Sequence, residues 1–255
     1  MKFQQIRNAT IRLQYGGVCF LVDPWLQRKG TGMRAKTPWP EKNSIASPLV
    51  ELPMAVEKIT ADVDALLITH IHPDYFDAET AERLDKTLGA FGQNERDREE
   101  MQRRGYQCVE VLNQAGTLFR GVTITRTPGQ HGVSSEKNAG PVCGAVFSAP
   151  GEKTLYLAGD TIFYPEVEQV LATRRPEVVV LNACGAELAE KGRLIMGKED
   201  VLSVCHAVPK ALVIASHMEA VNHATVTRKE LAAFLREQGV LEQIRIPEDG
   251  ECYNI

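Results

Sequence analysis

The 255-residue chain lacks a long apolar segment, an apolar leader and an excess of basic charge. Its longest apolar runs, such as Ala65–Ile68 and Val178–Leu181, are far shorter than the roughly 18 residues that a membrane-spanning helix needs, so no membrane partner is expected. Residues 1–7 are largely polar and no apolar stretch follows them, which predicts a cytoplasmic protein without a signal peptide. The 29 Lys and Arg against 33 Asp and Glu give a net charge of −4, which disfavours a nucleic-acid partner.

Several sequence motifs of other catalytic classes are also missing. None of the six cysteines forms a C-x-x-C pair, and we expect them to be buried free thiols in a reducing compartment. The sequence contains neither a G-x-S-x-G nor a P-loop motif. Covalent serine chemistry and nucleotide-driven chemistry therefore lack support.

The composition is that of a folded protein, with 44% hydrophobic and 24% charged residues, and the length suits a single domain over residues 1–255. The predicted strands are 10–13, 18–22, 64–69, 89–92, 108–112, 122–127, 145–148, 154–158, 178–181 and 211–215. The predicted helices are 78–88, 94–104, 166–173, 198–207 and 227–238. This order indicates an α/β protein with two sheets packed face to face and helices outside them.

Residues 27–53 interrupt this pattern, since they contain four prolines, two glycines and no sustained periodicity. They are predicted to form a long loop inserted near the active site. The loop carries Trp39 and several basic residues, so it could wall a pocket. A surface insertion without a functional role is the alternative.

The most informative motif is H-x-H-x-D at His70, His72 and Asp74, directly after the apolar strand 64–69. Two histidines at positions i and i+2 of extended backbone point to one side and can converge on one metal ion. Asp74 can reach a second ion or the water on the first, which makes it a candidate catalytic group.

Other potential ligands also follow predicted strands. His131 comes after strand 122–127, Asp160 after 154–158 and His217 after 211–215. Because strand ends at one edge of a sandwich meet in space, we expect these side chains to meet the His70 and His72 pair.

Three further residues are candidates for supporting roles. Asp23 directly follows strand 18–22 and is expected to orient a metal-binding histidine or to cap a turn. Asn182 follows strand 178–181, where a pocket role and simple packing are both open. His223 is a candidate catalytic or substrate-contacting residue that could also supply a missing metal ligand.

Together, the segments 70–74, 129–132, 159–161 and His217 resemble the metallo-β-lactamase superfamily. Residues 21–25 (LVDPW) and 217–223 (HMEAVNH) are similar to segments of its L-ascorbate-6-phosphate lactonase-like branch of metal-dependent hydrolases. The resemblance implies a four-layer αββα sandwich. It also implies a first metal on His70, His72 and His131, with Asp160 bridging to a second metal held by Asp74 and His217.

The chain departs from the family pattern H-x-H-x-D-H at one position, because Tyr75 replaces the last histidine. A phenol with an ordinary pKa of about 10 is a poor ligand, so Tyr75 is expected to line the pocket or donate a hydrogen bond. The cofactor is then one or two divalent ions, Zn²⁺ by preference or Mn²⁺.

The predicted function is metal-dependent hydrolysis, with a metal-activated water attacking an ester, lactone or phosphoester bond of a small molecule. The alternative is a non-hydrolytic protein on the same fold, namely a metal-binding, accessory or oxidoreductase protein. A homo-oligomer is left open.

Overall fold

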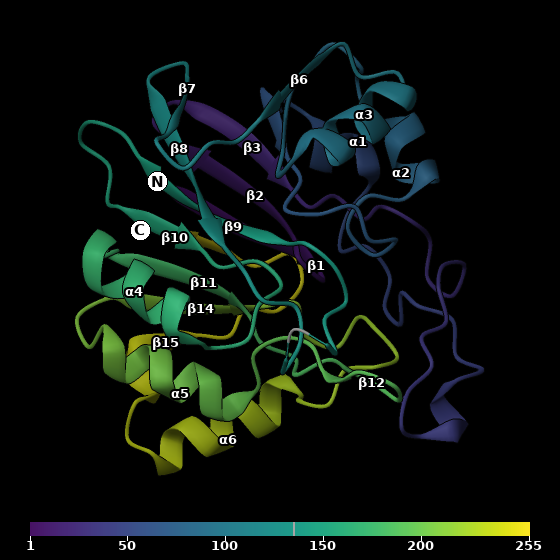
Figure 1. Ribbon diagram of the computed structural model, residues 1–255, viewed down its shortest axis with the longest axis vertical. Helices are drawn as coiled ribbons and strands as arrows, with labels where there is room; N and C mark the ends of the chain where they lie inside the picture. Colours follow the sequence, from purple (N-terminus) through teal and green to yellow (C-terminus); the bar gives the residue numbers. More distant parts are fainter. Residues whose placement is uncertain (135) are drawn as a thin grey trace.

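The computed structural model describes residues 1–134 and 136–255, and two seven-stranded sheets form its centre (Figure 1). The first sheet has the order β16 (Cys252–Asn254), β1 (Lys2–Arg7), β2 (Thr10–Tyr15), β3 (Val18–Val22), β4 (Ala65–Leu67), β5 (Gly89–Gly92) and β6 (Cys108–Val111). The second has the order β15 (Ile244–Arg245), β14 (Leu212–Ser216), β11 (Val178–Asn182), β10 (Leu155–Leu157), β9 (Cys143–Ser148), β8 (Val122–Pro128) and β7 (Thr117–Phe119). A separate short hairpin joins β12 (Glu187–Leu188) to β13 (Gly192–Arg193).

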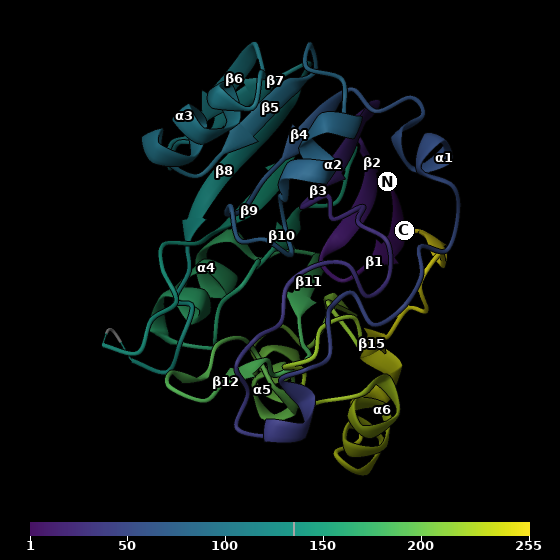
Figure 2. The same cartoon turned by 90° about the vertical axis from the view of Figure 1, so that its right-hand side faces the viewer.

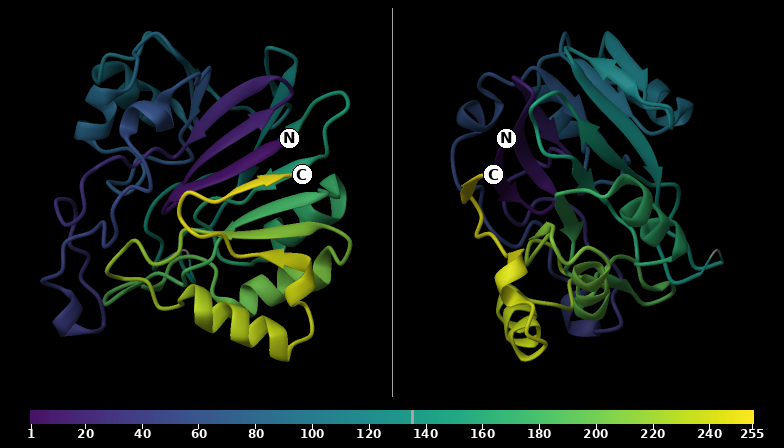
Figure 3. Two further views of the ribbon diagram at one scale, coloured as in Figure 1. Left: turned by 180° about the vertical axis from the view of Figure 1, so that it is seen from behind. Right: turned by 90° about the vertical axis from the view of Figure 1, so that its left-hand side faces the viewer.

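Helices cover the outer face of each sheet, which gives the four layers of an αββα sandwich (Figures 2 and 3). The first sheet packs against α1 (Val56–Thr60), α2 (Ala78–Arg83) and α3 (Glu95–Arg103). The second packs against α4 (Pro165–Arg174), α5 (Lys198–Ala207) and α6 (Arg228–Glu237). The predicted fold class is confirmed. No helix among the described residues is both long and apolar enough to cross a membrane.

The central strands are apolar on both faces because both faces are covered. In β11, Val178 and Val180 enter the core between the sheets, whereas Val179 and Leu181 pack under the helices. Successive side chains of a strand point to opposite faces, so a strand between two layers reads as a continuous apolar run. Each such side chain contributes roughly 1.5–3 kcal/mol when fully buried.

The direction of the strands places one set of strand ends at a common edge. β3, β4, β5 and β6 pair in parallel in the first sheet, and β10, β11 and β14 do so in the second. β8 runs in the same direction as β10, because both are antiparallel to β9. The loops that leave the carboxyl ends of β4, β8, β10 and β14 carry the candidate ligands.

Most predicted elements are present, with differences at their ends. The helix predicted over 78–88 ends at Arg83, and the strand predicted over 64–69 is the shorter β4. The prediction that all cysteines are buried is wrong for Cys108 and Cys252, which are exposed. Cys108 lies on β6 and Cys252 on β16, the two edge strands of the first sheet, where their side chains meet solvent.

The segment 27–53 forms a long loop, in which the one described helix is the 3-10 turn η1 (Pro40–Lys42). Arg7 anchors both ends of this loop to β1: its fully buried guanidinium donates to the carbonyls of Trp25 and Gln27 at the start and of Val50 near the end. A further anchor is Asn222, whose side-chain amide exchanges hydrogen bonds with the backbone of Ala35.

Candidate metal centre

The candidate ligands follow the ends of four strands. His70 comes after β4, His131 after β8, Asp160 after β10 and His217 directly after β14. All four side chains are buried. The structure thus brings together residues that are far apart in the chain, with 147 positions between His70 and His217.

The backbone of two loops is shaped for this approach. Gly159, with a φ of 70°, precedes Asp160, and a Cβ there would lie 2.5 Å from the carbonyl oxygen of Cys143. His217 adopts a left-handed φ of 63°, and its amide donates to the carbonyl of Asn8 at 3.0 Å. Left-handed backbone at a non-glycine residue is uncommon, and besides turns and helix caps it is found at functional sites.

Three histidines form the centre of the site. One ligand nitrogen each of His70, His72 and His131 lies within 4.8 Å of the others. The Nε2 atom of His70 is buried and has no hydrogen-bond partner among the described residues. Such an unpaired buried nitrogen costs free energy unless a ligand satisfies it.

Asp160 adds a carboxylate to this group. Its Oδ2 atom lies 3.7 Å from Nε2 of His70 and 3.6 Å from Nε2 of His131. Its Oδ1 atom accepts hydrogen bonds from the hydroxyl of Tyr75 and from Nδ2 of Asn182, the latter at 2.9 Å. Three imidazoles and one carboxylate oxygen are a donor set that suits a tetrahedral divalent ion such as Zn²⁺.

The protonation of the histidines also suits a metal. Burial lowers the pKa of His70 well below its usual value, and the neighbouring imidazoles of His72 and His131 lower it further. Burial likewise lowers the pKa of His131, against the opposing effect of Asp160. Both rings are therefore neutral at pH 7 and offer the lone pair that a metal needs.

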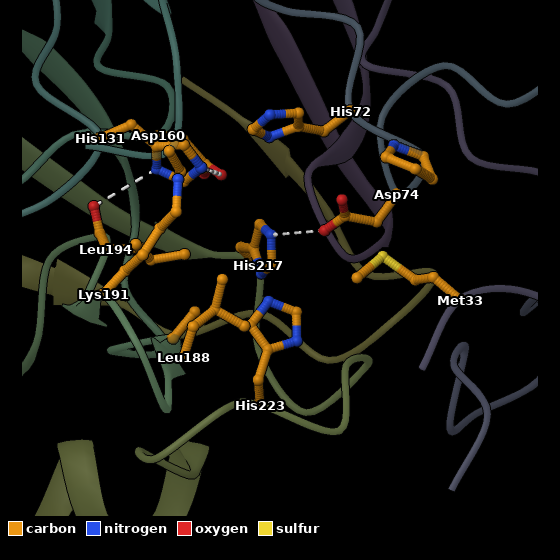
Figure 4. Close-up of a pocket in the computed structure, with 13 residues that line it drawn as sticks. Met33, His72, Asp74, His131, Asp160, Leu188, Lys191, Leu194, His217 and His223 are labelled. Carbon is orange, nitrogen blue, oxygen red and sulfur yellow. Dashed lines mark hydrogen bonds and ion pairs between the residues drawn. The ribbon is translucent and has the colours of Figure 1, made fainter. Parts of the chain in front are cut away.

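Asp74 and His217 form a buried ion pair beside the three histidines. Oδ2 of Asp74 lies 3.7 Å from Nε2 of His217, and Figure 4 shows the two side chains pointing toward one another. Burial opposes ionisation of Asp74, but the contact with His217 lowers its pKa to about 2. Burial would also lower the pKa of His217, but Cys184 and Asp74 raise it well above its usual value. The thiol of Cys184, 3.4 Å from Nδ1 of His217, is a contact that the sequence did not indicate.

Asp23 supports His70 through an intermediate residue. Its carboxylate accepts hydrogen bonds from the amide (2.7 Å) and the hydroxyl (2.8 Å) of Thr69. The same hydroxyl lies 3.2 Å from Nδ1 of His70. Asp23 therefore orients the histidine by way of Thr69, not by direct contact, and Thr69 was not among the residues singled out from the sequence.

A pocket of about 210 Å³ opens beside the histidines (Figure 4). Its lining residues are Met33, His72, Pro73, Asp74, His131, Ala139, Asp160, Ala186, Leu188, Lys191, Leu194, His217 and His223. Met33 comes from the loop 27–53, which thus contributes to the wall. His223 is buried, and burial lowers its pKa to about 4. Lys191 is a cation of the pocket that the sequence did not reveal, because a single lysine in a polar hairpin carries no signal of its own.

Comparison with known proteins identifies the family. The sequence profile described as "Beta-lactamase superfamily domain" matches residues 19–218. The chain belongs to this superfamily. Within it, the "UPF0173 protein YddR" of Bacillus subtilis (strain 168) is 44% identical over 255 residues, which cover 99% of each chain. The expectation of a metallo-β-lactamase fold is confirmed.

Two similar solved structures cover the whole chain. The isothiocyanate hydrolase from Delia radicum gut bacteria is 39% identical, with a TM-score of 0.93 over 100% of this chain and 99% of that one. A possible metal-dependent hydrolase from Veillonella parvula DSM 2008 is 31% identical, with a TM-score of 0.94 and the same coverage. The expectation that the chain belongs to a family of metal-dependent hydrolases is likewise confirmed.

Proposed function

We propose that this protein is a metal-dependent hydrolase whose substrate is an isothiocyanate, R–N=C=S, with a small apolar R group. The observation that carries the proposal is the position of the His70, His72 and His131 cluster at a compact pocket that also has apolar walls. The 39% identity to an isothiocyanate hydrolase over the whole chain supports the substrate.

The pocket suits such a substrate in size and polarity. Met33, Leu188 and Leu194 provide apolar walls, which would bury an alkyl or aryl group at roughly 25 cal/mol per Å² of apolar surface. An isothiocyanate is uncharged and linear, and its central carbon is electrophilic. It needs one attacking water, and the apolar walls can take its R group while the histidines and carboxylates of the pocket surround the reacting carbon.

The residues that would hold the metal are His70, His72, His131 and Oδ2 of Asp160. Zn²⁺ matches this nitrogen-rich set, whereas Mn²⁺ prefers more oxygen ligands. A divalent ion held by these residues would lower the pKa of its bound water to about 7 and so would supply a nucleophile at neutral pH.

Residues of the chain would guide the proton and the charge. Asp74, with a pKa of about 2, is ionised at neutral pH and would orient the attacking water and accept its proton. His217, which its raised pKa keeps protonated, lies beside Asp74 and would donate a proton to the substrate nitrogen. The amino group of Lys191, which donates to the carbonyl of Asn138 at 2.7 Å, provides positive charge where negative charge develops on sulfur or nitrogen.

The reaction balances as addition of one water. Oxygen bonds to the central carbon and gives the thiocarbamate R–NH–C(=O)–SH. Its C–N bond then breaks as the S–H proton passes to nitrogen and the C=S bond forms, so that the net change is R–N=C=S + H₂O → R–NH₂ + O=C=S. No oxidant or second substrate is required.

The ester, lactone or phosphoester predicted from the sequence is the second candidate, and Lys191 favours it. A cation at the pocket wall can hold an anionic group such as a phosphate. The cytoplasmic location, the small-molecule substrate, and the lack of nucleic-acid and membrane partners stay predictions.

The test is a substrate panel with zinc-reconstituted protein. Benzyl isothiocyanate should be consumed with release of benzylamine and carbonyl sulfide, faster than a p-nitrophenyl ester, a lactone or bis-p-nitrophenyl phosphate. The variant Asp74→Asn should lower kcat by roughly 10²- to 10⁴-fold, the usual contribution of a general base.

A matched control is Asp62→Asn, which makes the same change at an exposed residue outside the candidate metal centre and should leave kcat unchanged. If the phosphoester is turned over faster than the isothiocyanate, the second candidate function replaces the first. A zinc-loaded protein that is inert on every compound would favour the non-hydrolytic alternative.

A further inference from the structure

We propose that this protein binds a single divalent ion, because Tyr75 and Asn182 occupy the oxygen of Asp160 that a second ion would require. The inference rests on the metal site of the proposed function but not on its substrate. It gives Tyr75 and Asn182 the role of positioning residues that fix the carboxylate for one ion.

The two oxygens of Asp160 have different surroundings. Oδ2 faces the histidines, 3.7 Å from His70 and 3.6 Å from His131. Oδ1 instead accepts two hydrogen bonds, from the hydroxyl of Tyr75 and from Nδ2 of Asn182. Because a carboxylate oxygen offers about two lone-pair sites, Oδ1 has none left for a metal.

Tyr75 is held in this position from several sides. Its side chain is fully buried, and its ring centroid lies 4.0 Å from that of His70. Nδ2 of Asn182 also lies within hydrogen-bond distance of the Tyr75 hydroxyl, at 3.0 Å. The backbone amide of Tyr75 donates to the carbonyl of His72 at 3.0 Å, which ties the ring to the H-x-H segment.

Asn182 is fixed as well, because it ends β11 and pairs with Ser216 of β14 in the sheet register. Asn182 is 5% exposed, and its amide nitrogen donates hydrogen bonds to the Tyr75 hydroxyl and to Oδ1 of Asp160. Moving either donor away from Oδ1 would leave buried polar atoms unpaired, at about 1–3 kcal/mol for each.

The remaining groups are too few for a second ion. Asp74, His217 and His223 line the same pocket, and Oδ2 of Asp74 lies 3.7 Å from Nε2 of His217 (Figure 4). Among the described residues, however, only His70, His72 and His131 bring ligand atoms of three side chains within 4.8 Å of one another. Catalytic zinc sites use three protein ligands. The phenol of Tyr75 therefore stands where the site would need an imidazole.

The experiment counts zinc ions without any substrate. The protein is stripped with a chelator, reloaded with excess Zn²⁺, freed of unbound metal and analysed for zinc per chain. We expect one zinc in the wild type and two in Tyr75→His, since the imidazole adds a ligand and releases Oδ1. Tyr75→Phe is the matched control: it removes the hydroxyl without adding a ligand, and it should keep one zinc.

A second measurement does not depend on any variant. Zinc added to the stripped wild type should produce no tyrosinate absorption band, because the Tyr75 hydroxyl remains a hydrogen-bond donor. A tyrosinate band, two zinc ions in the wild type, or a folded Tyr75→His that holds one zinc would each overturn the proposal. The absence of any bound zinc would overturn the metal site itself, whereas a one-zinc protein that leaves isothiocyanates intact would refute only the substrate.

Discussion

The hydroxyl of Thr69 connects His70 to the buried carboxylate of Asp23, and its removal tests how far this connection determines metal affinity. When Nε2 of His70 binds a metal, Nδ1 carries the proton and can donate it to the Thr69 hydroxyl, 3.2 Å away. The hydroxyl in turn donates to Oδ2 of Asp23 at 2.8 Å. Thr69→Val keeps the shape of the side chain and removes this link.

The magnitude follows from the groups left unpaired. Thr69 is fully buried, so water cannot replace its hydroxyl. One carboxylate oxygen of Asp23 and the ring N–H of His70 each lose a partner, at about 1–3 kcal/mol apiece. The loss of such a supporting contact weakens metal binding by roughly 10- to 100-fold.

The assay is a competition for Zn²⁺ between the protein and a chromophoric chelator, with urea unfolding of the stripped protein in parallel. Thr69→Val should raise the zinc Kd by roughly 10- to 100-fold, whereas Thr69→Ser, which keeps the hydroxyl, should stay close to the wild type. An unchanged Kd in Thr69→Val would refute the connection. Equal weakening in both variants would assign the effect to the lost methyl group.

Three further outcomes are expected. Asn222→Ala releases the loop 27–53 from hydrogen bonds to Ala35 and Lys42, so steady-state kinetics should show KM raised roughly tenfold with kcat little changed; a lowered kcat with unchanged KM would contradict this. The folded-state pKa of His223 is lowered to about 4, below an unfolded value of about 6.5. The unfolded chain thus binds more protons between these values, and urea unfolding of the stripped protein should show about 2 kcal/mol lost between pH 7 and pH 5, with a smaller loss in His223→Gln. Thr227→Ala removes the cap of α6, whose hydroxyl accepts from the amide of Glu230, and should lower the free energy of unfolding by about 1 kcal/mol without altering zinc content.

Local signals in the sequence were sufficient for many of the elements. β3, β5 and α5 have the bounds that apolar runs and helical spacing predict. Asn94 and Thr227 cap α3 and α6 as their side chains indicate. These features depend on residues within a few positions of one another.

Elements held by distant partners were missed. β1 has the largely polar sequence KFQQIR, and it is a strand because it pairs with β2 on one side and with β16, at the other end of the chain, on the other. The hairpin of β12 and β13 has two-residue strands, which are too short to show an alternating pattern. Lys191 lies between these two strands and lines the pocket, so the sequence analysis missed it together with the hairpin.

The sequence by itself determined which side chains could bind a metal and that each would follow a strand. The motif of His70, His72 and Asp74, with His131, Asp160 and His217 at later strand ends, required no coordinates, because ligand chemistry and strand periodicity are both written locally. Only the tertiary structure decided which oxygen of Asp160 faces the histidines and which accepts the hydrogen bonds. The contacts of Asp160 with Tyr75 and Asn182 join residues 85 and 22 positions apart, and no local pattern encodes which oxygen faces which neighbour once two sheets have packed together.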